Sequence, residues 1–150
     1  MAKLHTFLIH FPIALYITAF LVEIVSIFVM NRISKQVSLI LVYLGTIASI
    51  ISAYTGNLAG LNAINLIHNI QPHLNRHENS GTLLTWIGII ASILLIYFQL
   101  KDKSINILRF LIIFTLAVTS FFTGLTGSKL VREFGSGTNL IKSNYVPLDK

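Results

Sequence analysis

Four long apolar runs constrain the fold of this chain more than any other feature of its sequence. The runs cover about residues 8–30, 37–61, 81–100 and 105–126. An α-helix rises about 1.5 Å per residue, so about twenty apolar residues cross the roughly 30 Å hydrocarbon core of a bilayer. A mean hydropathy of +0.77 with 11% charged residues lies far outside the range of soluble domains. The sequence therefore predicts an all-α integral membrane protein whose 150 residues form a single domain.

The segments between the runs predict how the four transmembrane helices are connected. Residues 31–36 and 101–104 are short and polar, which is typical of tight turns between antiparallel helices. The segment 62–80 is longer and rich in Asn and His. Two tight turns and one longer link predict an up-down-up-down bundle.

The longer link has a helical pattern of its own. Ile64, Ile67 and Ile70 recur at three-residue spacing, which predicts an amphipathic connector lying at the membrane interface. Pro72 is suited to be the first residue of the third helix. Residues 127–150 are predicted to form a tail outside the bilayer.

An even number of spans places both termini and the 62–80 connector on one side of the membrane. The tight turns lie on the other side and are dense in basic residues, namely Arg32, Lys35, Lys101 and Lys103. Basic residues concentrate in cytoplasmic loops, so the sequence predicts cytoplasmic turns and periplasmic termini. The net charge of +6 is explained by this topology and by contact with anionic lipid, and no nucleic acid partner is expected.

All five histidines fall on the predicted outer side, in two groups: His5 and His10, then His68, His73 and His77. Counting from the turns, His10 lies 21 residues before Asn31 and His77 lies 22 residues before Gln99. Because helix rise converts these counts into depth, the two are expected at one level, facing each other. His5 and His73 form a second level, roughly 6 Å further out.

The residue types limit what such a site binds. The chain has no cysteine, which excludes covalent c-type haem, iron–sulfur clusters and thiolate zinc sites. The predicted ligands of one or two b-type haems are His10 with His77 and His5 with His73, and His68 is a weaker candidate. The alternatives are copper or zinc held by His73 and His77 one helical turn apart, or polar side chains with no ligand at the interface.

Small residues recur at three- and four-residue spacing in three of the runs. They are Gly45, Ser49, Ser52 and Gly56; Gly81, Thr85, Gly88 and Ser92; and Ala117, Ser120, Gly124 and Gly127. Such stripes favour close packing of membrane helices, and the alternative is room for a flat macrocycle.

Glu23 lies well inside the first run and Arg109 at a similar depth in the fourth, which predicts a buried ion pair in preference to a proton-transfer role.

Several of these landmarks resemble an uncharacterised bacterial family of four-helix membrane domains. The most specific is a histidine, a short apolar gap and then His-Phe-Pro-Ile-Ala-Leu. The similar elements here are His5, residues 10–15, Glu23, Thr55-Gly56, His77 with Asn79, residues 123–131, and Gly135 with Gly137. The chain departs from the family pattern at Thr6, where proline is common, and at Ser128, where glycine is usual.

The resemblance implies a function as well as a fold. Members of that family are often joined to, or encoded beside, c-type cytochrome domains, which implies redox work at the outer face of the bacterial inner membrane. We therefore expect an electron-transfer subunit of a larger respiratory complex, carrying electrons from a quinol or another membrane donor to a periplasmic cytochrome. The alternative is a non-catalytic membrane subunit or a protein that handles copper or zinc.

Overall fold

The computed structural model describes residues 2–29, 32–64, 70–101 and 106–135. They form five helices: α1 (Ala2–Leu8), α2 (His10–Val29), α3 (Arg32–Ile64), α4 (Gln71–Leu100) and α5 (Asn106–Phe134). Because α1 and α2 follow each other along one line, the described residues contain four helical segments that are long and apolar enough to cross a membrane. The predicted number of spans is confirmed.

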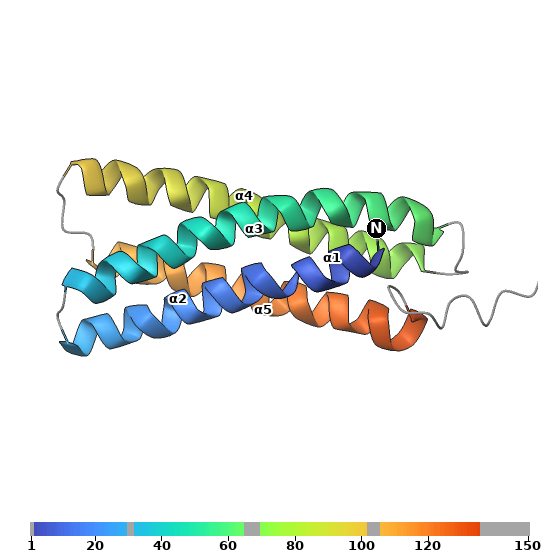
Figure 1. The fold of residues 1–150 in the computed structure, drawn as a ribbon, viewed down its shortest axis with the longest axis horizontal. Helices are drawn as coiled ribbons and strands as arrows, with labels where there is room; N and C mark the ends of the chain where they lie inside the picture. Colours follow the sequence, from blue (N-terminus) through green and yellow to red (C-terminus); the bar gives the residue numbers. More distant parts are fainter. Residues whose placement is uncertain (1, 30–31, 65–69, 102–105, 136–150) are drawn as a thin grey trace, which may run out of the picture.

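The four segments form an elongated antiparallel bundle (Figure 1). The ends of α2 and α4 lie at one end of the bundle, beside the starts of α3 and α5. The N-terminus, the end of α3, the start of α4 and the end of α5 lie at the other end, which we call the N-terminal end. Around the bundle, α2 packs against α3 and α5, and α4 packs against the same two helices. The predicted up-down-up-down arrangement is therefore confirmed.

The helices are longer than the apolar runs that predicted them. Helix α4 begins at Gln71 with Pro72 in its first turn, as the proline predicted, so it starts ten residues before its apolar run, and α5 continues to Phe134 rather than ending near residue 126. Hydropathy falls where polar side chains begin, but backbone hydrogen bonding continues past that point. The link between α3 and α4 is consequently shorter than expected, and residues 65–69, which include His68, lie outside the described residues.

The first span is broken between α1 and α2. Ile9 belongs to neither helix, although its N–H still donates to the His5 carbonyl at 3.0 Å. Pro12 has no N–H, so the Leu8 carbonyl lacks the donor that a continuous helix would provide four residues later. Proline at this position therefore separates a seven-residue α1 from the rest of the span.

The middle of the bundle is packed around Tyr16, which is completely buried. Its ring lies against Gly45 of α3, where an added Cβ would be 2.9 Å from Tyr16 Cε1, and its hydroxyl lies over Gly88 of α4. The same hydroxyl shares a 3.0 Å hydrogen bond with Thr46 Oγ1, and Thr46 shares another of 3.0 Å with Ser92. At this level the small residues serve close helix packing.

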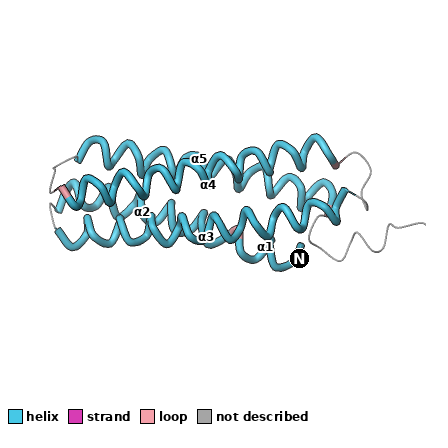
Figure 2. The backbone as a smooth tube through the Cα atoms, turned by 90° about the horizontal axis from the view of Figure 1, so that it is seen from above, coloured by secondary structure: helices cyan, strands magenta, loops and turns pink. Residues whose placement is uncertain are grey.

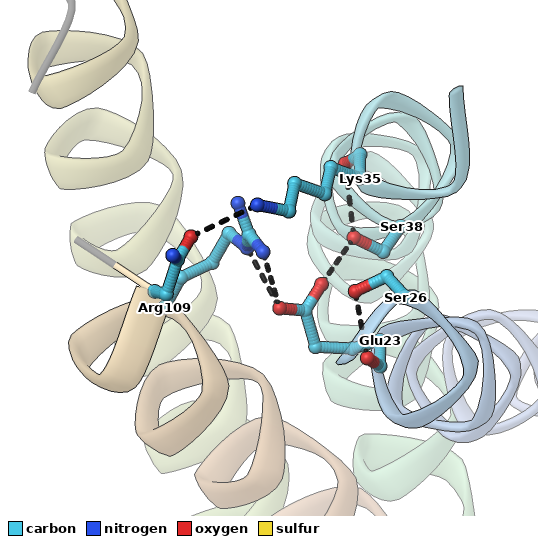
Figure 3. Close-up of polar contacts among 6 residues, drawn as sticks. Glu23, Ser26, Lys35, Ser38 and Arg109 are labelled. Atoms are coloured by element: carbon cyan, nitrogen blue, oxygen red, sulfur yellow. Dashed lines mark hydrogen bonds and ion pairs between the residues drawn. The ribbon is translucent and has the colours of Figure 1, made fainter. Parts of the chain in front are cut away.

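The end of the bundle with the α2–α3 turn contains a buried ion pair (Figure 3). Arg109 Nη2 of α5 lies 2.7 Å from Glu23 Oε1, and Arg109 Nε donates to the same oxygen at 2.7 Å. Ser38 of α3 donates to Glu23 Oε2 at 2.7 Å. The carboxylate, which is 0% exposed, thus connects α2, α3 and α5. The ion pair expected from the sequence is present.

Removing one member of this pair should be far more harmful than removing both. Glu23→Gln or Arg109→Gln alone leaves a buried group without its partner, which typically costs about 3 to 5 kcal/mol, whereas the double variant is expected to be close to the natural protein in stability. Thermal unfolding of the three variants in detergent measures this. Lys129→Gln is the control, because its pairing with Glu133 is exposed and should contribute little. Additive losses in the double variant would contradict the pairing.

Candidate functional site

A pocket lies between the helices at the N-terminal end of the bundle. It is lined by α1, α3, α4, α5 and the start of α2. On α4 it extends from Leu74 to Thr85, which is roughly 16 Å along a helix. The empty space is about 970 Å³, including the part that is open to the outside. The pocket is therefore a long slot with an open mouth.

Two histidines from different helices meet in this slot. His5 of α1 and His77 of α4 have ring centroids 6.1 Å apart, and the planes of the rings are inclined at 65°. Both rings line the pocket and both are partly buried. The fold thus brings together residues that are far apart in the sequence.

A threonine fixes each of these rings through Nδ1. His5 Nδ1 lies 3.3 Å from Thr55 Oγ1, and His77 Nδ1 lies 3.0 Å from Thr126 Oγ1. Each threonine hydroxyl also lies within hydrogen-bond distance of a backbone carbonyl in its own helix, that of Ile51 at 3.0 Å for Thr55 and that of Thr123 at 2.9 Å for Thr126. In the tautomer with the proton on Nδ1, the hydroxyl donates to the carbonyl and its oxygen accepts from Nδ1–H, which leaves the Nε2 lone pair free to bind a ligand.

The residue after each of these threonines is a glycine that makes room for the ring. A Cβ added at Gly56 would lie 2.8 Å from His5 Cε1, and one added at Gly127 would lie 2.9 Å from His77 Cε1. A Thr-Gly dipeptide, Thr55-Gly56 for His5 and Thr126-Gly127 for His77, therefore holds each histidine. Gly81 also lines the pocket, but a Cβ there would meet nothing within 4 Å.

One polar atom in the slot has no partner. Ser52 is 6% exposed and lines the pocket, and its Oγ is the buried side-chain oxygen or nitrogen in the described ranges for which the structure provides no hydrogen bond. A buried hydroxyl without a partner costs free energy unless something in the pocket binds it. Ser52 is thus available to a molecule that occupies the slot.

The expected pairing of His10 with His77 is wrong. His10 is exposed and does not line the pocket, and His5 takes its place. The inward positions of the first span follow three- and four-residue spacing through Pro12, Tyr16, Ala19 and Glu23, and extending this spacing backwards reaches Ile9 and His5. The depth count ignored this angular pattern, and the break at Ile9 shifts α1 relative to a straight helix.

The second expected pair, His5 with His73, does not form either. The His73 ring contacts Phe134 with ring centroids 5.1 Å apart, and His73 does not line the pocket. It lies beside a small apolar cluster of Ile70, Leu74 and Leu130. A metal site built on His73 and His77 therefore has no support from their surroundings.

The donor set at the slot fits some metal groups and not others. Within the described residues there is no group of three or more His, Asp or Glu side chains that could hold a metal ion. Structural zinc sites normally have four protein ligands, so zinc fits poorly. Two neighbouring imidazoles fit a metal that brings its other ligands with it, as haem iron does. With metal–nitrogen bonds of about 2 Å, two such rings have centroids about 6 Å apart, which agrees with the observed separation.

Sequence comparison defines the class of protein. A family model described as "Predicted membrane protein (DUF2231)" matches residues 2–140. The chain belongs to this family, as the motif at residues 10–15 had indicated, and it is an all-α membrane protein with four spans. No curated protein and no solved structure matches it significantly.

Two glycines of the pocket should respond differently to alanine. In Gly127→Ala the new methyl group displaces the His77 ring from Thr126, so we expect a loss of about 1 to 3 kcal/mol in the free energy of unfolding. Gly81→Ala is the matched control, because its methyl group enters open space and alanine favours the helix by about 0.5 to 1 kcal/mol. Thermal unfolding in detergent compares them. Equal stability of the two variants would contradict the described contact at Gly127.

Proposed function

We propose that this protein is a membrane electron-transfer subunit that binds b-type haem between His5 and His77. One observation carries the proposal: the two rings approach each other from different helices, at the separation that one metal ion between them requires. Haem supplies four of the six iron ligands itself, so two histidines complete the set.

The chain's own residues would orient the ligands and shield the site. Thr55 and Thr126 hold the Nδ1–H groups, which fixes the ring orientation and increases the basicity of Nε2. Ile9, Ile13 and Leu84 line the slot and limit the access of water. When bound, haem supplies one-electron transfer, and its potential is set by the two histidines, by burial and by hydrogen bonds.

The position of the slot suggests where the electron partners act. Arg76 and Lys129 are exposed within two residues of His77 and Gly127, so this level of the bundle suits the bilayer surface rather than its centre. A group there is accessible to a lipid-dissolved donor such as quinol and to a c-type cytochrome outside the membrane. We infer that the protein works in the bacterial inner membrane, with the N-terminal end of the bundle on the periplasmic side, as part of a larger redox complex.

Copper bound by the same two histidines is the second candidate. The observation in its favour is that the two rings are close enough for a single ion to bind both, without the space that a macrocycle needs. Imidazole is a suitable ligand for copper, so metal analysis has to accompany the test for haem.

The two histidines of the slot should be required for haem binding, and His10 should not. We expect the purified protein to show a b-type reduced-minus-oxidised spectrum, with the haem identified by pyridine extraction. His5→Ala and His77→Ala should each lose the haem or convert it to a high-spin form, because one axial ligand is gone. His10→Ala is the matched control in the same span and should keep the natural spectrum. If the purified protein contains copper and no haem, and if His5→Ala and His77→Ala lose the copper, the second candidate is correct and the haem proposal is wrong.

The proposed orientation can be tested separately. Cysteines at Ser34, beside the α2–α3 turn, and at Ser128, near the end of α5, should react with membrane-impermeant reagents from opposite sides of sealed cells. Ser128 should react from outside and Ser34 only after the membrane is permeabilised. Reaction of Ser34→Cys from outside, with Ser128→Cys protected, would reverse the orientation.

A further inference from the structure

The wall of the slot that carries His5 is the least anchored element of the bundle. Helix α1 has only seven residues and none of them is buried. It packs along α3 and makes no comparable contact with α4 or α5. Figure 2 shows α1 beside α3, with α5 on the far side of the bundle. His77, by contrast, belongs to a thirty-residue helix packed on two neighbours.

The bundle closes only after α1 ends. Ile13 of α2 reaches α5, where a Cβ added at Gly124 would lie 3.1 Å from Ile13 Cδ1. From Ile13 onwards α2 packs along both α3 and α5. On the N-terminal side of this contact the slot has α1 as one wall and α5 as another, with no close packing between them. The mouth of the slot therefore lies between α1 and α5.

The helix is interrupted between the loose wall and the closed bundle. Ile9 is outside both helices and Pro12 cannot donate a hydrogen bond to the Leu8 carbonyl. A helix of seven residues is too short to be stable without its packing partner. Elements with few buried contacts open at a lower free energy than the core.

The mouth lies at the level of Arg76 and Lys129, whose side chains are exposed. Charged side chains at this level are typical of the membrane interface. A molecule that reaches the mouth from the side therefore has to be amphiphilic, with an apolar body that partitions into lipid. The buried hydroxyl of Ser52 inside the slot provides a polar contact for such a molecule.

We propose that α1 is a hinged wall, that the occupant of the slot enters from the membrane surface between α1 and α5, and that α1 then closes to bring His5 onto it. The nature of the occupant rests on the proposed function, in which it is haem, whereas the hinge itself does not. Haem meets the chemical requirement because it is a flat amphiphile with a polar edge. In this account His77 is fixed in advance and His5 arrives last.

Hydrogen exchange of the natural protein in detergent tests the hinge, with and without haemin. Without haemin, the hydrogen-bonded amides of residues 6–9 should exchange at least tenfold faster than those of residues 46–55 on α3. Saturating haemin should slow the exchange of residues 6–9 by at least tenfold and leave the exchange rate of residues 46–55 unchanged. Equal protection of the two segments in haem-free protein would overturn the hinge. If haemin does not bind at all, the proposed function fails, and the comparison in haem-free protein still decides the hinge.

A proline variant tests the entry step. Pro12→Ala restores the missing N–H and should join α1 to α2 as a continuous helix, so haemin delivered from lipid vesicles should bind at least threefold more slowly, with the same final spectrum. Pro72→Ala is the control, because Pro72 lies in the first turn of α4 and interrupts no helix. Hydrogen exchange shows whether residues 6–9 of Pro12→Ala have become as protected as α3. If they have, and if haemin uptake is still as fast as in the natural protein, entry through the hinged wall is wrong.

Discussion

A polar side chain inside a membrane bundle needs a hydrogen-bond partner, and where that partner lies on another helix it sets the register of the two helices. Glu23 with Arg109, Tyr16 with Thr46, and His5 with Thr55 meet this need at three successive levels of the bundle. Each of these contacts joins helices that hydrophobic packing alone would leave free to slide, because lipid tails are as apolar as the helix surfaces. A shift of the first span, α1 with α2, by a single turn would break all three contacts at once.

The polar side chains at the two ends of the bundle differ in how completely they are hydrogen-bonded. At the end with the α2–α3 turn, every oxygen of the Glu23 carboxylate is paired, which describes a structural contact. At the N-terminal end, two imidazoles are held through Nδ1 while their Nε2 atoms are left for something else, and Ser52 has no partner. A satisfied network stabilises a fold, whereas polar groups held in place and left unsatisfied prepare a binding site. The contrast supports a ligand at the histidines and none at the ion pair.

The sequence predicted the parts of the structure that depend on hydropathy and charge. Long apolar runs and short polar turns were enough for the number of spans and their alternation, and Glu23 and Arg109 were expected to pair because both lie within apolar runs at a similar depth. The start of α4 was predicted from Pro72, but the end of α5 was not, since α5 continues through polar residues to Phe134. The histidine pair was predicted on the correct spans but with His10 in place of His5. Depth fixes only the height of a side chain, and its direction depends on the three- and four-residue spacing that contains His5 and Tyr16 but not His10. The break at Ile9 and the hydrogen bonds of Thr55 and Thr126 depend on three-dimensional packing, which spacing alone does not reveal.

The proposed function requires His5 and His77 to bind one haem iron together. Electron paramagnetic resonance of the oxidised protein, prepared with ¹⁵N-labelled histidine, can show whether they do. We expect a low-spin ferric signal with hyperfine coupling to two histidine nitrogens, and loss of one coupling in His5→Ala when added imidazole restores the low-spin state. A low-spin signal that retains both histidine couplings in His5→Ala would contradict the claim, because a different residue would then provide the second ligand.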